Sequence, residues 1–357
     1  MKGLMVIMGT RPEIIRLYHT IETLRPEFLV WTNQNYSKNL KEEIFFDSEF
    51  PLYKDIVVGL TDVNFIADNS EVSSIFSVGF SAMIQFIDKA IEKNKPKKIL
   101  ILGDTNTSLA GALMAKKHGI QLFHMEAGNR CYNPESPEEC NRKMIDSITD
   151  IHLCYTDFAK QNLLHEGVPL NRIHVIGNPI AEIDLYTKPS THSVTNSALF
   201  DIHRAENEKY LYDILLAASK LNNSLMLLHP RYEKKVKNLV KFREWKNIEV
   251  RPSVGFTEFI KHQRSSALVI TDSGTVCEEA AIIGRPCIIL RETMERPELL
   301  EMGSTVLCHP KDWEGVLEAY SELVNRDTLD WEIPSWYRAQ KISQKVKNIL
   351  LSKGNYI

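Results

Sequence analysis

The chain has 357 residues, of which 43% are hydrophobic and 25% are charged, and its formal net charge is −3. This length is too great for one ordinary hydrophobic core, so we expect two domains. No strongly basic segment marks a nucleic-acid-binding surface, and no apolar run approaches the roughly 20 residues of a membrane-spanning helix. Nucleic acid and membranes are therefore not expected as partners.

The first segment, "MKGLMVIMG", has the lysine and the apolar run of a signal peptide. The apolar run covers only residues 4–8, and no small-residue cleavage site follows, so we interpret it as a buried strand. The six cysteines, which contain no Cys-x-x-Cys pair, are Cys131, Cys140, Cys154, Cys277, Cys287 and Cys308. This pattern predicts reduced thiols in a cytoplasmic protein and no structural zinc site.

Short apolar runs alternate with longer amphipathic segments through the first half of the chain. The predicted strands are 4–8, 28–33, 97–104, 121–128, 150–156 and a segment within 171–179. Helices are predicted from Pro12, before Gly119 and before Gly167. This rhythm is typical of a parallel sheet that helices cover on both faces.

The pattern breaks at 184–196, which we interpret as a linker, and then restarts. The predicted strands of the second half are 197–203, 224–230, 248–252, 267–274 and 286–292. The tail from Trp336 onward predicts one long amphipathic helix. We therefore predict an α/β protein with two doubly wound Rossmann-like domains that face each other across a cleft. The expected parts are an N-terminal domain at 1–185, a C-terminal domain at 195–335 and a final helix at 336–357.

Polar side chains follow nearly every predicted strand. Ligands of doubly wound sheets bind outside the carboxyl ends of the strands, so we expect these side chains to share one edge. They are Arg11, Glu13, Gln34, Asp104, Glu126, His203, His229, Asp272, Ser273, Arg291 and Glu292. Any one of them can be an ordinary cap or turn residue, but the whole set indicates a ligand site.

The segment "TDSGTVCEE" predicts a strand that ends at Asp272 and a helix that opens at Ser273. Free N–H groups and the helix dipole favour an anion there, and Gly274 would let a phosphate approach the backbone. A carboxylate of Glu278 or Glu279 can accept hydrogen bonds from both hydroxyls of a ribose. The plainer alternative is an N-capped helix with acidic first turns. The glycine and the paired glutamates favour a nucleotide.

Three segments bring carboxylates to the first domain. They are "GDTNTSLAG" with Asp104, "HMEAGNR" with Glu126, and "SPEECNRK" with Glu138 and Glu139. The arginines in neighbouring motifs are Arg11, Arg16, Arg130 and Arg142. Clustered carboxylates together with a phosphate site indicate proton transfer on a nucleotide-activated substrate. The plainer alternatives are a helix N-cap at Asp104 and a network of salt bridges that holds the loops.

Histidine and arginine follow two predicted strands of the second domain, in "HRAEN" (203–207) and "LLHPR" (227–231). Both side chains suit a diphosphate, because they supply charge and hydrogen-bond donors together. A structural histidine is the alternative at either position.

Taken in order, several motifs resemble the non-hydrolysing UDP-N-acetylglucosamine 2-epimerase family. They are "GTRPEIIR", "TNQNY", "GDTNTSLAGAL", "HMEAGNR", "PEECNRK", "IGNP", "HRAEN", "TDSGTVCEEA" and "RETMERPE", and the match spans residues 4–305. The resemblance implies a glycosyltransferase-B-like fold whose last helix crosses back to the first domain. It also implies a cytoplasmic homodimeric isomerase that needs no metal or redox cofactor.

The reaction implied by the resemblance inverts C2 of a UDP-2-acetamido sugar, for surface-polysaccharide precursors. Removal of the C2 proton eliminates UDP, which then adds back to the 2-acetamidoglycal with protonation on the opposite face. The first domain would hold the acid/base groups and the second would bind UDP. The implied catalytic residues are Asp104, Glu126, Glu138 and His203, with His203 neutralising the diphosphate. The implied substrate contacts are Arg11, Arg16, Gln34, Arg142, His229, Ser273, Gly274, Thr275, Glu279 and Arg296. Glu13 is expected to brace its loop.

The chain departs from the common family pattern at Arg16, Ala205 and Thr275, where lysine, arginine and glycine are usual. The segments "TNQNY", "IIR", "EAGNR" and "DSGT" are similar to the branch that acts on UDP-2-acetamido-2,6-dideoxy-L-hexoses and forms UDP-N-acetyl-L-fucosamine. The substrate stays open between such a sugar, UDP-N-acetylglucosamine and another UDP-sugar. Rival functions are a hydrolysing 2-epimerase, a glycosyltransferase of the same fold and a non-catalytic UDP-sugar sensor.

Overall fold

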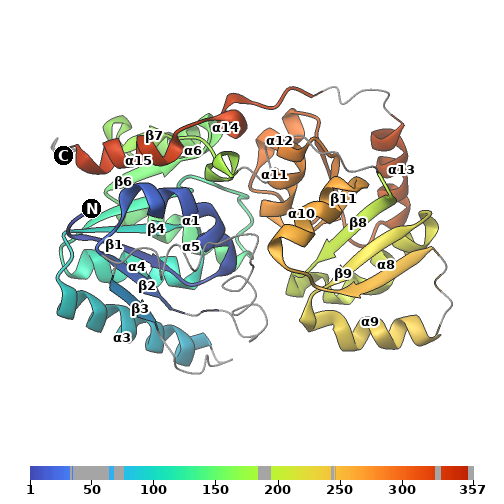
Figure 1. Cartoon of the computed structure of the whole chain (residues 1–357), viewed down its shortest axis with the longest axis horizontal. Helices are drawn as coiled ribbons and strands as arrows, with labels where there is room; N and C mark the ends of the chain where they lie inside the picture. Colours follow the sequence, from blue (N-terminus) through green and yellow to red (C-terminus); the bar gives the residue numbers. More distant parts are fainter. Residues whose placement is uncertain are drawn as a thin grey trace. The chain divides into compact units, whose positions relative to one another are not determined.

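The structure is a computed structural model that describes residues 1–32, 34, 64–67, 76–183, 194–242, 245, 247–325 and 331–352. It divides into two compact units (Figure 1). The first combines Met1–Ile183 with Ser335–Ile357, and the second comprises Asp184–Pro334. The predicted linker lies mostly outside the described residues. Within the described ranges, no helix is both long enough and apolar enough to cross a membrane.

The sheet of the first unit is parallel, with the strand order β3-β2-β1-β4-β5-β6-β7. Its strands are β1 (Leu4–Met8), β2 (Phe28–Trp31), β3 (Asn64–Ala67), β4 (Lys98–Leu102), β5 (Gln121–Met125), β6 (Ile151–Cys154) and β7 (Ile173–Val175). The chain runs outward from β1 in one direction to β2 and in the other to β4. The carboxyl ends of β1 and β4 therefore form a topological switch point, where ligands of such sheets bind.

Helices cover both faces of this sheet. They are α1 (Arg11–Leu24), α3 (Phe76–Asn94), α4 (Asn106–Lys117), α5 (Pro137–Ile148), α6 (Asp157–His165), α14 (Ser335–Arg338) and α15 (Ile342–Leu351). On one face, Met5 and Ile7 of β1 pack with Ile87 of α3, Ala112 of α4 and Ile145 of α5. Helices α1 and α15, from opposite ends of the chain, pack side by side (Figure 1).

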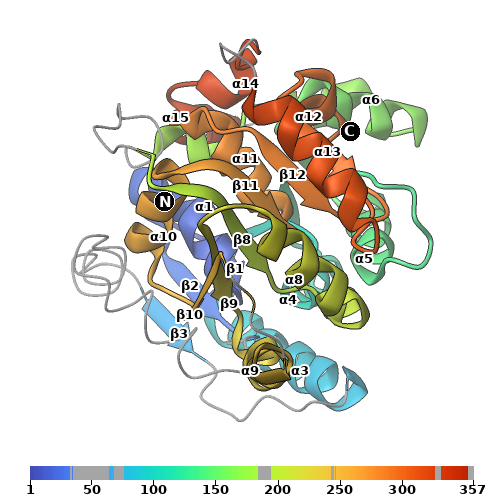
Figure 2. The same ribbon diagram turned by 90° about the vertical axis from the view of Figure 1, so that its right-hand side faces the viewer.

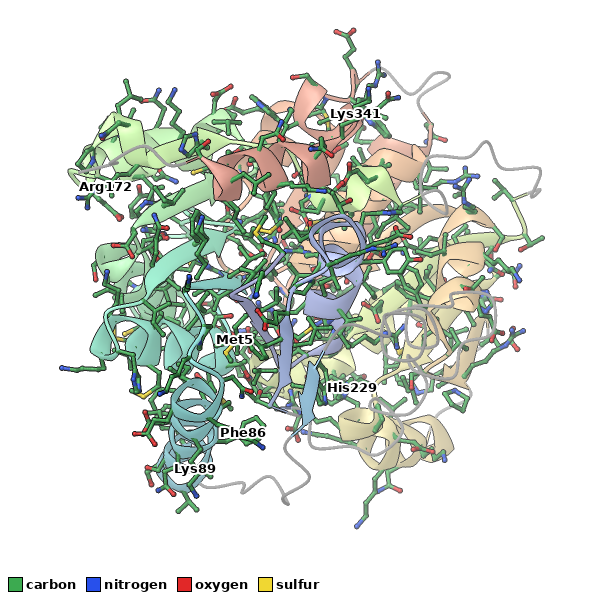
Figure 3. The ribbon with its side chains drawn as sticks, turned by 60° about the vertical axis from the view of Figure 1, so that its left-hand side comes forward. Met5, Phe86, Lys89, Arg172, His229 and Lys341 are labelled. Carbon is green, nitrogen blue, oxygen red and sulfur yellow. The ribbon has the colours of Figure 1, made fainter. Side chains whose placement is uncertain are left out.

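The tail differs from the single helix expected from Trp336, because α14 and α15 are separate. Lys341, just before α15, has a left-handed φ of 61° (Figure 3). Because α15 begins anew after this break, the N–H groups of its first turn have no acceptor within the helix, and the Ser343 N–H donates to Glu182 Oε2 at 3.0 Å. A carboxylate is favourable at that position because the helix dipole is positive there.

The second unit has a parallel sheet of its own, with the strand order β10-β9-β8-β11-β12-β13. Its strands are β8 (Asn196–Ile202), β9 (Ser224–Leu228), β10 (Ile248–Pro252), β11 (Ser266–Thr271), β12 (Cys287–Leu290) and β13 (Thr305–Cys308). Its helices are α8 (Leu211–Lys220), α9 (Pro230–Phe242), α10 (Phe256–Arg264), α11 (Gly274–Ile283), α12 (Pro297–Glu301) and α13 (Trp313–Val324).

The core of the second unit lies between its sheet and helices α8, α9 and α13. Phe200 of β8 and Ile270 of β11 pack there with Leu215, Val236 and Val316. Figure 2 shows α8 and α13 in front of this sheet. The switch point of this unit lies at β8 and β11, which are neighbours in the sheet. The predicted pair of doubly wound parallel α/β domains is thus confirmed, although β3 and β13 were not among the predicted strands.

Candidate active site

The loop after β1 is held by Glu13. Its Oε2 accepts hydrogen bonds from the N–H groups of Gly9 (2.6 Å) and Thr10 (2.7 Å). Its Oε1 accepts from the hydroxyl of Thr105 (2.7 Å), which caps α4. Burial raises the pKa of Glu13, and these donors oppose that effect. Glu13 therefore joins the loop after β1 to the start of α4, which is the bracing role expected of it.

Asp104 follows β4 directly and is bound by Arg142 of α5. The Asp104 Oδ2 and the Arg142 Nη2 are 2.5 Å apart, and 28% of the Asp104 side chain is exposed. The Asn141 side chain donates to the Asp104 carbonyl at 2.9 Å. Asp104 is thus fixed at both its backbone and its carboxylate while one side stays open to solvent.

Glu126 follows β5 and forms an ion pair with Arg16 of α1. Its backbone has a left-handed φ of 68°, which costs a residue with a side chain about 1–3 kcal/mol. Asn129 donates to its other carboxylate oxygen at 3.3 Å, and the Arg16 guanidinium lies 5.9 Å from the Tyr155 ring centre. Strained backbone and a paired carboxylate are both common at sites of chemistry.

The structure brings Asp104 and Glu126 to the ends of neighbouring strands, because β4 and β5 pair with Leu102 opposite Met125. Arg16 and Arg142 were predicted as substrate contacts, but each is instead seen holding one of these carboxylates. The sequence motifs did not show these two ion pairs, and the substrate contacts of Arg16 and Arg142 stay predictions.

Glu138 and its neighbour Glu139 differ sharply in their surroundings. Glu138 is half-buried at the start of α5, and its carboxylate accepts from the Ser136 hydroxyl at 3.1 Å. Glu139 is buried and accepts from the Cys131 N–H (2.9 Å) and from Arg142 (3.0 Å). Although burial opposes its charge, these bonds lower the pKa of Glu139. Glu139, not Glu138, is therefore the carboxylate that shares Arg142 with Asp104.

Gln34 and Arg11 were both predicted to contact the substrate. The carboxamide oxygen of Gln34 accepts from the N–H (2.9 Å) and the hydroxyl (2.8 Å) of Thr107, in the first turn of α4. Gln34 therefore supports the helix that follows Asp104. Arg11 is the first residue of α1, is partly exposed, and pairs with no carboxylate in the described part of the chain.

In the second unit, Asp272 organises the loop after β8. Asp272 is fully buried and accepts from the N–H groups of His203 (3.1 Å) and Arg204 (2.9 Å) and from the Asn207 side chain (2.9 Å). The His203 ring Nδ1 lies 3.3 Å from Asp272 Oδ1 and 3.6 Å from Asp201 Oδ2. Although burial opposes the imidazolium, these two carboxylates raise the pKa of His203.

His229 follows β9 (Figure 3), and its ring centre lies 6.2 Å from that of His203. Burial lowers the pKa of His229, and the positive charges of His203 and Arg231 add to this effect. The Arg231 guanidinium donates to the His203 carbonyl at 2.9 Å. The loops after β8 and β9 therefore present one histidine with a raised pKa, one with a lowered pKa, and an arginine.

Helix α11 begins as predicted, with Ser273 as its N-cap; the Ser273 hydroxyl accepts from the Val276 N–H at 3.4 Å. The need for glycine at 274 has a reason that the sequence did not show. A Cβ there would stand 2.5 Å from Glu295 Oε1 and 2.6 Å from Arg296 Nη1. Thr275, the next residue, is half-buried. The absence of a side chain at Gly274 therefore leaves space for the side chains of Glu295 and Arg296. This requirement does not depend on a ligand at the Gly274 N–H group.

Arg296 was predicted to contact the substrate, but it lies in a buried ion network. Its Nε is 2.5 Å from Glu278 Oε1, and its Nη1 is 2.5 Å from Glu295 Oε1. The other Glu295 oxygen lies 2.7 Å from Arg291 Nη1. Arg296 itself is 4% exposed. The network ties α11 to the segment between β12 and α12.

Glu279, the predicted ribose contact, is also buried, and its carboxylate accepts from the Gln263 side chain of α10 at 2.7 Å. That bond sets the orientation of the carboxylate. Among the described residues, no three His, Cys, Asp or Glu side chains are grouped as metal ligands.

Comparisons with known proteins agree on one family. The family model described as UDP-N-acetylglucosamine 2-epimerase matches residues 22–351. The chain is 33% identical to a UDP-N-acetylglucosamine 2-epimerase of Methanocaldococcus jannaschii, across 99% of this chain and 100% of the relative. It is 31% identical to a UDP-2,3-diacetamido-2,3-dideoxy-D-glucuronate 2-epimerase of Pseudomonas aeruginosa, across 85% of this chain and 87% of the relative.

A solved structure agrees with these relatives. It is the M. jannaschii UDP-GlcNAc 2-epimerase in complex with UDP-GlcNAc and UDP, with a TM-score of 0.82 and 32% identity, across 97% of this chain and 99% of that one. Nearly the whole chain is therefore matched by the family model, by relatives and by a fold. The chain belongs to the UDP-N-acetylglucosamine 2-epimerase family.

Proposed function

We propose that the protein inverts C2 of a UDP-2-acetamido sugar by eliminating UDP and adding it back. Family membership supports this reaction. The observation that carries it is the pair Asp104 and Glu126, each bound by an arginine at the end of adjacent strands beside a switch point. Proton transfer to and from carbon needs positioned carboxylates of this kind.

The proposed reaction divides the work between the units. In the first, a carboxylate of Asp104, Glu126 or Glu138 removes the C2 proton as the bond from C1 to the diphosphate oxygen breaks. UDP leaves with the bonding electrons and a 2-acetamidoglycal remains. Re-addition of UDP to C1 is then accompanied by protonation of C2 from the opposite face. The second unit is proposed to bind UDP through His203, His229, Ser273, Gly274, Thr275 and Glu279, and Arg11 is the proposed contact from the first unit.

Deuterium incorporation tests the proposal. Product formed in D₂O should carry deuterium at C2, because the proton removed by the carboxylate exchanges with solvent before C2 is protonated again. NMR of the UDP-sugar pool measures this directly. A converted product that is fully protonated at C2 would contradict the elimination mechanism.

The same incubation separates the rival functions. A hydrolysing 2-epimerase would release UDP and a free sugar, and a glycosyltransferase would leave the UDP-sugar unchanged without an acceptor. A sensor would bind the UDP-sugar without exchange at C2. A panel that includes UDP-N-acetylglucosamine and a UDP-2-acetamido-2,6-dideoxy-L-hexose identifies the preferred sugar.

The raised pKa of His203 predicts a pH dependence of UDP binding. An imidazolium attracts the diphosphate, so its contribution is complete below the ordinary histidine pKa of about 6.5 and disappears as the pH rises through the raised value. We expect the ratio of UDP affinities of the wild type and His203→Gln to fall toward one at high pH. Calorimetry measures both, and taking the ratio removes the titration of UDP itself. A ratio that is independent of pH would place the diphosphate away from His203.

The cellular setting is also part of the proposal. All six cysteines are free, which supports a reducing compartment such as the cytoplasm. The homodimer implied by the family resemblance and a role in surface-polysaccharide precursor synthesis stay predictions.

A further inference from the structure

Four charged side chains form a chain behind the two carboxylates of the first unit; three are buried, and Glu166 at the outer end is 32% exposed. Glu166 binds Arg130 at 2.7 and 2.6 Å, and Arg130 Nη2 lies 2.8 Å from Asp146 Oδ2. Asp146 Oδ1 lies 2.7 Å from His124 Nδ1. The other ring nitrogen of His124, Nε2, lies 2.9 Å from the Gly103 carbonyl oxygen. His124 and Asp146 are each only 1% exposed.

The two partners of His124 determine its protonation. Asp146 is ionised, because its Oδ2 lies 2.8 Å from Arg130 Nη2 and accepts from the Gly128 N–H at 3.0 Å, and its pKa is lowered although burial opposes this. A carboxylate and a peptide carbonyl can only accept hydrogen bonds, so both ring nitrogens of His124 must carry protons. The ring is then an imidazolium, and the charges of Glu166, Arg130, Asp146 and His124 alternate and sum to zero.

This charge chain forms hydrogen bonds to both turns that carry the proposed acid/base groups, the turn after β4 and the turn after β5. The Gly103 carbonyl belongs to the peptide that leads into Asp104. Asp146 Oδ2 also accepts from the Gly128 N–H at 3.0 Å, two residues beyond Glu126. A Cβ on Gly103 would stand 3.4 Å from Glu126 Oε2, so the two turns are close neighbours. Holding one turn in place relative to the other therefore also sets the positions of the Asp104 and Glu126 carboxylates.

We propose that His124, whose two ring nitrogens bind Asp146 and the Gly103 carbonyl, is a positioning residue that sets the separation of Asp104 and Glu126. The proposal rests on the proposed function of these carboxylates. It gives the charge chain a role beyond stability, because displacing a reacting group by about 1 Å can cost 10²-fold in rate. The other titratable side chains beside Asp146 are His152, whose Nε2 contacts the Asp146 carbonyl at 2.9 Å, and buried Cys154.

Two substitutions of His124 separate its two bonds. The side-chain nitrogen of asparagine takes the place of Nδ1, so His124→Asn keeps the bond to Asp146 and loses the bond to Gly103. We expect kcat to fall about 10–100-fold, with KM changed by less than about twofold. The nitrogen of glutamine takes the place of Nε2, so His124→Gln restores the donor to Gly103. It should recover about tenfold of the lost kcat.

The matched control is His152→Asn. His152 lies opposite His124 in the pairing of β5 with β6 and is equally buried, but its Nε2 contacts the Asp146 backbone carbonyl instead of a carboxylate-bearing turn. Its kcat per folded molecule should stay within about twofold of the wild type. Folded fractions come from circular dichroism. An equal loss of kcat in His152→Asn, or a wild-type kcat in His124→Asn, would overturn the positioning role.

Nitrogen NMR of ¹⁵N-histidine-labelled wild type tests the same inference without turnover. Both ring nitrogens of His124 should show the protonated signature at pH 8, and a neutral ring would overturn the proposal even if neither variant folds. Wild type that shows no exchange at C2 with any UDP-sugar would refute the proposed function, and the positioning role with it. Exchange in the wild type with unchanged turnover in His124→Asn would refute the positioning role alone.

Discussion

Replacing Asp104 by asparagine or Glu126 by glutamine should lower kcat by about 10²–10⁴. Each change keeps the shape of the side chain and removes a carboxylate that can accept a proton. Arg142 would retain Glu139 as a charged partner in Asp104→Asn, so that variant should fold. Epimerisation followed by NMR, and corrected for the folded fraction, measures the effect.

UDP affinity should change little in both variants, because UDP is proposed to bind the second unit. The matched control is Glu22→Gln on α1, whose carboxylate is 57% exposed and should be dispensable. Normal turnover in the folded part of either carboxamide variant would make that carboxylate a loop brace. Accumulation of glycal and UDP in one variant would show that elimination survives there and would assign that residue to re-addition.

Replacing Arg296 by methionine should lower the free energy of unfolding of the second unit by about 3–5 kcal/mol. Methionine fills much of the same volume but removes a charged partner of buried Glu278 and one charged partner of buried Glu295, which keeps Arg291. A buried carboxylate that loses a charged partner is left with less compensation for the water that it gave up on folding. Urea unfolding followed by circular dichroism measures the shift.

The control for this change is Lys237→Met on α9. Lys237 pairs with Glu233 at 2.5 Å, but the two side chains are 63% and 45% exposed. An exposed pair contributes little, so this variant should stay within about 0.5 kcal/mol of the wild type. If Arg296→Met instead keeps full stability and loses only UDP affinity, Arg296 is the substrate contact that its motif suggested.

Local pattern was sufficient to predict most of the fold. Each long apolar run became a buried strand, because a strand covered on both faces must be apolar along its whole length. The strands β3 (NFIA) and β13 (TVLC), which lie at the edges of their sheets, were missed. The break between α14 and α15 was missed as well, because "YRAQKIS" contains no glycine or proline to mark it.

The candidate site was predictable only in part. Asp104, Glu126, His203 and Asp272 could be placed from sequence, because parallel strands bring their carboxyl ends to one edge of a sheet. The side chains that pair with these residues could not be placed from sequence. Arg16 and Glu126 are 110 residues apart in the chain, and nothing local in either motif shows that they pair.

The sequence by itself thus determined the alternation of strands and helices, the family and the strand ends at which polar residues cluster. Only the tertiary structure decided which arginine binds which carboxylate. It shows that Arg16, Arg142 and Arg296, which were predicted as substrate contacts, each form an ion pair within the protein. The physical reason is that hydrophobic periodicity depends only on the residues of one segment. The partner of a buried charge comes from whichever distant segment packs against it.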